Sequence, residues 1–359
     1  MSAVPAPPPP GDAALRVAGL PKLLAAYAFP RWKWRYVRQC FPGHAVRFVR
    51  DAATIPPAAG LLLWGNAPLP QGVPHAAPVI RMEDGFLRSV GLGAELVRPL
   101  SWVVDTQGIY YDAGRPSDLE TLLAGATFTP ALLSRARALR TGIVQAGLTK
   151  YNVGCAPWRR PAQAARVILV PGQVESDASI AYGATRLRRN VDLLRAVREQ
   201  HPDAHVVYKP HPDVAARLRL LGQGEEQAHV WCDEIVVDAD MHALLDSVDE
   251  VHVLTSLAGF EALLRGKPVT CWGQPFYAGW GLTRDVDAHP RRRRVLSLDE
   301  LVAGALILYP LYLGRSSRAL ITPEQALEEL RCWKARQAGK TPWWQGIYRF
   351  FLRRFIGVR

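Results

Sequence analysis

Two neighbouring carboxylates follow a short apolar run early in the chain. Glu83 and Asp84 follow the run 78–81, separated from it by Met82, and precede Gly85. Adjacent carboxylates repel each other, so one of them tends to hold its proton and can act as a general acid or base. An acidic turn, with Gly85 as a residue of positive φ, explains the same three residues without chemistry. The pair is a candidate catalytic site with a structural alternative.

A second acidic loop follows the apolar run 166–170. Gln173, Glu175 and Asp177 lie in the stretch PGQVESDAS, which leads into an expected helix. A glycine-containing loop of this kind can present carboxylates to a sugar carbon or to ribose hydroxyls. A helix N-cap, in which Ser176 or Asp177 satisfies free amides, is the structural alternative. Both interpretations stay open.

Two further stretches have features of phosphate-binding sites. In YKPHP, a histidine held between two prolines has little freedom, so His211, next to Lys209, can be aimed at a phosphate at modest entropic cost. Thr255 and Ser256 lie where an expected strand gives way to the helix that carries Glu261, so hydroxyls and free N–H groups would face one point. A structural histidine and an ordinary serine N-cap are the respective alternatives.

A loop at 273–285 holds three aromatic residues and three glycines. Loops of this composition commonly form one wall of a sugar or nucleotide pocket, which makes Tyr277 and Trp280 candidate pocket residues. The structural alternative is that the rings pack beneath the loop.

The elements expected to position these residues form two groups. Short apolar runs bounded by glycine and proline, at 60–65, 78–81 and 101–105, suit buried parallel strands. Beyond a polar, proline-interrupted stretch at 156–161, strands alternate with helices, as in a doubly wound parallel sheet whose ligands sit at the carboxyl ends of strands. Expected strands are 166–170, 205–209, 229–232, 250–254 and 268–272, and expected helices are 119–139, 185–199, 214–221, 241–247 and 257–265. Four parts follow: a disordered proline-rich tail (1–12), a Rossmann-like domain (13–155), a second one (156–300), and C-terminal helices (301–359).

Composition limits the function classes. The 359 residues contain no window of the ~18 consecutive apolar residues that a spanning helix requires, and residues 1–12 lack the apolar core of a secretory signal, so we expect a cytoplasmic protein. Five widely spaced cysteines without CxxC spacing argue against a cysteine zinc site. The net charge of +12 indicates an anionic partner, and without an RRM, KH or helix-turn-helix pattern we expect no nucleic acid.

The C-terminal segment is basic and aromatic. Residues 331–359 hold eight lysines or arginines and no acidic residue, interleaved with tryptophan, tyrosine and phenylalanine. Segments of this kind lie at an anionic bilayer surface. A helix that packs on the N-terminal domain with a solvated basic face is the alternative.

Taken together, the motifs resemble the KpsC-type capsule polysaccharide proteins, the bacterial β-Kdo transferases (Kdo is 3-deoxy-D-manno-oct-2-ulosonic acid). The resemblance covers roughly residues 79–313, in order, through the stretches 83–93, 108–112 with 117–120, 172–175, 208–212 and 275–283. It implies a GT-B architecture of two facing Rossmann-like domains, with CMP-Kdo held mainly by the second, the acceptor approaching from the first, and no metal. Well-known members carry two such modules, and this chain has one.

The resemblance also implies retention of the β configuration, which fits a double displacement through a glycosyl-enzyme adduct. Asp177 is the expected nucleophile and Glu83 the acid/base. The expected donor-binding residues are Gln173, Glu175, Lys209, His211, Thr255, Ser256 and Glu261, and the expected sugar or acceptor pocket comprises Arg88, Ser89, Tyr277 and Trp280.

The implied function is transfer of β-Kdo from CMP-β-Kdo to a (lyso)phospholipid-linked Kdo acceptor in capsule polysaccharide biosynthesis, with other capsule-assembly proteins as further candidate partners. The Glu-Asp-Gly and His-Pro pair also resembles bacterial GT-B sialyltransferases, in which the second acidic residue is the base of a single-step inversion. Asp84 is therefore the rival catalyst. Residue 176 is serine where the family often has an acid, which leaves Glu175 and Asp177 as the carboxylates of that loop. Two further alternatives are a GT-B sugar epimerase, which would share the histidine and the phosphate-binding helix but use a UDP-sugar, and a non-catalytic capsule assembly or export factor.

Overall fold

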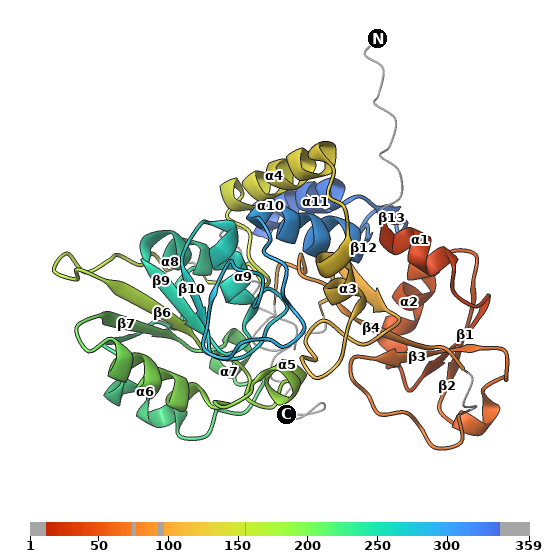
Figure 1. The fold of residues 1–359 in the computed structure, drawn as a ribbon, viewed down its shortest axis with the longest axis horizontal. Helices are drawn as coiled ribbons and strands as arrows, with labels where there is room; N and C mark the ends of the chain where they lie inside the picture. Colours follow the sequence, from red (N-terminus) through yellow and green to blue (C-terminus); the bar gives the residue numbers. More distant parts are fainter. Residues whose placement is uncertain (1–11, 74–76, 92–96, 155, 338–359) are drawn as a thin grey trace, which may run out of the picture.

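The computed structural model describes residues 12–73, 77–91, 97–154 and 156–337, which form two β-sheets flanked by helices (Figure 1). The expected α/β class is confirmed. The expected disordered tail, apart from Asp12, and residues 338–359 of the basic aromatic segment lie outside the described residues. No helix in the described ranges is long and apolar enough to span a bilayer.

The first sheet has seven strands in the order β13-β12-β5-β4-β3-β1-β2. Its strands are β1 (Leu23–Tyr27), β2 (Ala45–Val49), β3 (Gly60–Trp64), β4 (Val79–Asp84), β5 (Ser101–Asp105), β12 (Pro310–Leu313) and β13 (Leu320–Ile321). Strands β1 to β4 pair in parallel, whereas β5 runs antiparallel to β4. The expectation that 101–105 is a parallel strand was wrong. A parallel return needs a crossover, usually a helix, and the described part of the β4–β5 connection contains none.

The second sheet has six strands in the order β11-β10-β9-β6-β7-β8, and every pair is parallel. Its strands are β6 (Val167–Pro171), β7 (His205–Lys209), β8 (Glu234–Ile235), β9 (Glu250–Val253), β10 (Val269–Cys271) and β11 (Arg284–Asp285). The chain builds outward from β6 to one edge and from β9 to the other. The crevice outside the carboxyl ends of β6 and β9 is therefore the switch point at which doubly wound sheets bind ligands.

The helices depart from the expected ranges where capping residues intervene. Residues 119–139 do not form one helix, because Thr129 caps a new helix that has Pro130 in its first turn. The expected strand at 229–232 is largely replaced by the 3-10 helix η4 (Glu225–Val230), and Val230 is 59% exposed. The other helices are α1 (Asp12–Ala18), η1 (Arg31–Lys33), α2 (Trp34–Cys40), η2 (Ala52–Thr54), α3 (Asp118–Gly125), α4 (Pro130–Gln145), α5 (Ala178–Gly183), α6 (Asn190–Gln200), α7 (Pro212–Ala215), α8 (Met241–Ser247) and α9 (Leu257–Leu264).

The C-terminal part returns to the first sheet. After the second sheet, α10 (Leu298–Val302) and the π-helical segment η5 (Ala303–Leu308) lead into β12, so the region expected to be only helical also supplies two strands. Helix α11 (Pro323–Gln337) lies beside α4, to which it is joined by the ion pair between Arg135 and Glu324 (Figure 1). The chain crosses between the sheets twice, which ties them together.

Aromatic side chains join the two sheets. Phe86, which follows β4, stacks on Phe276, which follows β10, with ring centroids 4.3 Å apart. Tyr110, which follows β5 of the first sheet, and Phe260, on α9 beside the second sheet, each contact both of these rings. Buried side chains from both sheets thus form one continuous core cluster. The relative position of the sheets is set by apolar burial, which is the arrangement that limits domain motion.

Candidate active site

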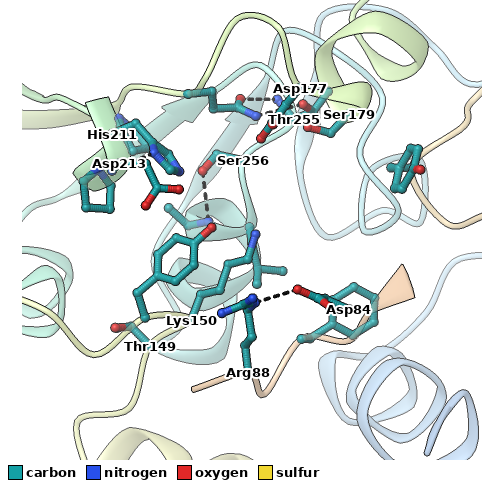
Figure 2. Close-up of a pocket in the computed structure, with 18 of the residues that line it drawn as sticks. Asp84, Arg88, Thr149, Lys150, Asp177, Ser179, His211, Asp213, Thr255 and Ser256 are labelled. Atoms are coloured by element: carbon teal, nitrogen blue, oxygen red, sulfur yellow. Dashed lines mark hydrogen bonds and ion pairs between the residues drawn. The ribbon is translucent and has the colours of Figure 1, made fainter. Parts of the chain in front are cut away.

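A cavity of about 440 Å³ lies where the carboxyl ends of strands from both sheets meet (Figure 2). Its walls come from the end of β4, the segment 149–153 that connects the two sheets, and the loops after β6, β7 and β9. Ten of the residues predicted from the sequence line it: Glu83, Asp84, Arg88, Gln173, Asp177, Lys209, His211, Thr255, Ser256 and Glu261.

The adjacent carboxylates Glu83 and Asp84 have different environments. Burial, followed by the neighbouring charge of Asp84, raises the pKa of Glu83 to about 7. Burial would also raise the pKa of Asp84, but the positive charges of Arg88 and Lys33 outweigh it and hold that pKa below its usual value. Arg88 Nε donates to Asp84 Oδ2 over 2.7 Å. Near neutral pH, Glu83 can therefore exchange a proton, whereas Asp84 stays ionised and is a weak base.

The acidic-turn alternative does not describe this pair. Both carboxylates belong to β4, where they pair with β5. Gly85 has no positive φ. A glycine is needed there for another reason, because a Cβ would lie 2.6 Å from Ser101 Oγ.

Asp177 occupies the N-cap position of α5, yet its side chain makes no capping hydrogen bond. The carboxylate instead lines the cavity, across from Arg88 and Asp84 (Figure 2). Burial raises the pKa of Asp177, while the charges of Lys150 and Arg219 oppose the rise. The N-cap interpretation therefore leaves the side chain unexplained, and an Asp free of backbone partners is a suitable nucleophile.

His211 is neutral and has a defined orientation. Its Nδ1 accepts a hydrogen bond from the backbone N–H of Asp213 over 3.2 Å. Burial, with the positive charges of Lys150 and Arg219, lowers the pKa of His211 to about 3. A neutral ring whose Nδ1 accepts must carry its proton on Nε2. His211 can therefore donate one hydrogen bond to a ligand oxygen but adds no charge.

Thr255 and Ser256 lie between β9 and α9, at the switch point of the second sheet. Ser256 Oγ caps α9 by accepting from the N–H of Ala258. Thr255 and Gln173 form a reciprocal pair, in which Gln173 Nε2 donates to Thr255 Oγ1 over 3.0 Å and Gln173 Oε1 accepts from the Thr255 N–H over 2.9 Å. Gln173 thus joins the loop after β6 to the loop after β9 and fixes this end of the cavity.

Lys209 and Glu261 line the cavity but are engaged elsewhere. Lys209 Nζ donates to the carbonyl of Val237, and burial lowers its pKa. Burial raises the pKa of Glu261 to about 7, and its Oε1 accepts the backbone N–H of Lys150. Both residues brace loops around the cavity.

Four predicted site residues lie outside the cavity lining. Tyr277 and Trp280 are fully buried, so the prediction that they form a pocket wall was wrong. Tyr277 Oη donates to the Ser256 carbonyl and Trp280 Nε1 to that of Phe276, because a buried aromatic donor needs an acceptor. Ser89 is buried against Arg88. The Glu175 carboxylate accepts backbone N–H groups of Asn190 and Gln223 and so holds two loops together.

Several cavity residues were not singled out from the sequence. They are Lys33, Trp64, Tyr110, Lys150, Tyr151, Asp213 and Arg219. Asp213 directly follows the His-Pro stretch, which was a usable signal. Lys150 and Tyr151 lie in an irregular connection without a pattern in the sequence. Their position depends on contacts to both sheets.

In the described part of the chain, one group of side chains has the composition of a metal site, and it lies away from the cavity. It consists of His201, Glu250 and His252. His252 Nδ1 accepts from the indole N–H of Trp272, so Nε2 carries the proton and donates to Glu250 Oε1 over 2.6 Å. Both ring nitrogens of His252 therefore take part in hydrogen bonds, and the Arg166 guanidinium pairs with the Glu250 carboxylate. His252 and Glu250 are therefore explained as members of a hydrogen-bonded ion network.

Comparisons with known proteins agree with this geometry. The family model for capsule polysaccharide biosynthesis proteins matches residues 71–153 and 157–313. LipA of Neisseria meningitidis serogroup A, a capsule polysaccharide modification protein, is 47% identical over 275 residues, which are 76% of this chain and 39% of LipA. LpsZ of Rhizobium meliloti, a lipopolysaccharide-processing protein, is 47% identical over 75% of this chain and 63% of its own length. The chain thus spans only about 40–60% of the length of these relatives.

Two solved structures match most of the fold. The β Kdo 2,7 transferase of Thermosulfurimonas dismutans KpsC has a TM-score of 0.72 and 41% identity, and the match covers 87% of this chain and 99% of that one. The β Kdo 2,4 transferase of the same protein has a TM-score of 0.70 and 31% identity, with 86% and 98% coverage. The chain described here belongs to the capsule polysaccharide biosynthesis protein family.

Proposed function

We propose that this chain is a retaining glycosyltransferase of GT-B arrangement that moves β-Kdo from CMP-β-Kdo to a (lyso)phospholipid-linked Kdo acceptor in capsule polysaccharide biosynthesis. The observation that carries the proposal is that two carboxylates line one cavity between two sheets: Asp177, whose side chain makes no capping hydrogen bond to α5, and Glu83, which has a pKa of about 7. The likeness to two KpsC Kdo transferases supports the donor and the acceptor class.

In this mechanism Asp177 attacks the anomeric carbon, C2, of the donor sugar. A C2–O bond to the carboxylate forms, and the bond to the phosphate breaks with its electron pair, which leaves with CMP. An acceptor hydroxyl then attacks C2 and gives its proton to Glu83, while the C2–carboxylate bond returns its electrons to Asp177. Two inversions at C2 leave the product in the β configuration of the donor.

The donor phosphate would lie against the second sheet. His211 Nε2 can donate to it, and the start of α9, which Ser256 caps, adds the positive end of a helix dipole. We propose that these groups make a metal ion unnecessary. Full turnover in the presence of a chelator is the expected result, and loss of turnover that added Mg²⁺ restores would refute this part.

The acceptor would enter from the side of the first sheet and come from a membrane. Trp32, Lys33 and Trp64 line that end of the cavity, and Lys33 Nζ lies over the Trp64 ring. Aromatic and cationic groups together suit an anionic sugar on a lipid. We propose a cytoplasmic protein that binds the inner-membrane surface peripherally. Co-sedimentation with anionic vesicles that decreases with salt is expected, and equal recovery with and without vesicles at low salt would contradict it.

The decisive experiment incubates the purified chain with CMP-Kdo and a synthetic Kdo-terminated lipid and determines the product by NMR. A new β-linked Kdo residue is expected, and the greater identity to the 2,7 transferase favours that position. An α-linked product would mean inversion, with Asp84 as the base. Absence of any product, with vesicle binding intact, would leave the non-catalytic assembly factor.

A further inference from the structure

The segment that connects the two sheets places one cation between the proposed catalytic carboxylates. Lys150 lines the cavity, and its side chain extends from the Arg88 side toward Ser256 (Figure 2). Among the positive charges that act on Glu83 are Lys33 and Lys150, and those that act on Asp177 are Lys150 and Arg219. Lys150 is the charge that the two sets share.

The backbone around Lys150 is held from both sides. Its N–H donates to Glu261 Oε1 on α9, and its carbonyl accepts from the N–H of Ser89 in the loop after β4. Asn152, which has a φ of 51°, closes the turn by donating to the carbonyls of Ser89 and Thr149. A non-glycine residue with positive φ is held in place by such surrounding contacts. The lysine is therefore on a braced turn.

Three of the other cations of the cavity are already engaged. Arg88 is paired with Asp84, and Lys33 lies against Asp84 and the Trp64 ring. Lys209 Nζ donates to the Val237 carbonyl. Arg219 acts on Asp177 but is absent from the charges that act on Glu83. Lys150 itself contacts Tyr151, with Nζ 5.0 Å from the ring centroid, but burial raises the pKa of Tyr151 and keeps this partner neutral. Lys150 is therefore the cation best placed to meet a second anion at the reacting carbon.

The chemistry of the proposed substrate supplies that anion. In a 2-ulosonic acid, the anomeric carbon itself bears a carboxylate, so a nucleophilic carboxylate must approach a carbon that already carries a negative group. Two negative charges that approach the same carbon atom repel each other strongly where water is excluded. A cation next to both groups removes this repulsion and gives the sugar carboxylate a charge-assisted hydrogen bond.

We propose that Lys150 binds the carboxylate on the anomeric carbon of the donor sugar and thereby selects ulosonic-acid donors. This inference rests on the proposed function. It assigns to the connection between the sheets a part in substrate recognition, beside the phosphate contacts of the second sheet.

The test compares Lys150→Met and Lys150→Arg with the wild type by calorimetric titration of CMP-Kdo and, separately, of CMP. Lys150→Met loses one charge-assisted hydrogen bond, so its affinity for CMP-Kdo should be about ten- to a hundredfold lower than that of the wild type. Its affinity for CMP should stay within about twofold of the wild-type value. Lys150→Arg keeps the charge and should recover most of the loss. Lys267→Met, whose Nζ donates to the carbonyls of Asp246 and Val248 outside the cavity lining, is the matched control.

The outcomes separate the two proposals. If Lys150→Met weakens CMP and CMP-Kdo equally, the lysine serves the phosphate and the inference is wrong. The inference is also wrong if the wild type transfers Kdo and Lys150→Met binds both CMP and CMP-Kdo with unchanged affinity. A wild type that neither binds nor turns over CMP-Kdo overturns the proposed function itself. Unchanged CMP binding shows that Lys150→Met is folded.

Discussion

Replacing Glu83 by glutamine should make the protein more stable above neutral pH while removing most of its activity. A carboxyl group whose pKa is raised on folding contributes stability below its unfolded pKa, and that contribution is lost as the pH rises through its folded pKa. For Glu83 the window runs from about pH 4.5 to about pH 7. The shift corresponds to up to about 3 kcal/mol at pH 8. Glutamine resembles the neutral acid and cannot ionise, so Glu83→Gln avoids this loss.

The effect on catalysis has the opposite sign. Removing a general base typically costs about 10²–10⁴-fold in rate. In the wild type, the transfer rate should fall about tenfold per pH unit below the pKa of Glu83, because the protonated acid cannot accept the acceptor's proton. This fall in rate at low pH is the acidic limb of the pH–rate profile. In Glu83→Gln the acidic limb should disappear together with most of the transfer rate.

Denaturant unfolding of both proteins at pH 5 and pH 8 measures the first effect, and product formation across pH 5–9 measures the second. Glu261→Gln is the matched control, since burial raises the pKa of Glu261 to about 7 as well. It should gain stability at pH 8 yet keep the acidic limb. A stability difference between Glu83→Gln and the wild type that does not depend on pH would refute the reasoning from burial. If the acidic limb survives in Glu83→Gln, the group whose protonation stops transfer is a residue other than Glu83.

Three further substitutions test other parts of the site. Asp177→Ala should abolish transfer while CMP binding persists, and near-normal turnover would remove Asp177 as the nucleophile. His211→Ala should weaken CMP binding about tenfold by loss of one hydrogen bond, to the same extent at pH 5.5 and pH 8 because the pKa of His211 is about 3; a titration series that shows a strong pH dependence would contradict the neutral ring. Trp280→Phe should lower the free energy of unfolding by about 1–3 kcal/mol without changing CMP affinity, and weaker CMP binding in an equally stable variant would return Trp280 to the pocket.

The sequence predicted the second sheet better than the first. Its four longer strands, β6, β7, β9 and β10, have three to five largely buried residues rich in apolar side chains, which is typical of parallel strands covered on both faces. The two-residue edge strands β8 and β11 lack this pattern and were not predicted at their positions. In the first sheet, β1 and β2 were missed. The partly exposed β2 has no apolar run, and β1 is rich in alanine, so neither has a strong local signal. The direction of β5 depends on a connection whose path no local pattern encodes.

The site residues divide in the same way. Residues at strand ends, such as Asp84, Asp177 and Ser256, were found because topology alone places strand ends at one edge of a sheet. Tyr277 and Trp280 were misplaced because an aromatic loop has the same composition whether its rings face a ligand or the core. Lys150 was missed because its position is fixed by Glu261 and Ser89, which are remote from it in the chain.

The charge balance of the cavity explains how adjacent carboxylates can have different roles. Asp84 is held ionised by Arg88 and Lys33 from the first sheet, and its negative charge helps to raise the pKa of Glu83. The half with the second sheet supplies Asp177, whose side chain makes no capping hydrogen bond. The proposed proton acceptor thus comes from the half with the first sheet, and the proposed nucleophile from the half with the second sheet. The aromatic contacts between Phe86 and Phe276 hold the halves together, so the packing of the core and the chemistry of the cavity depend on the same interface.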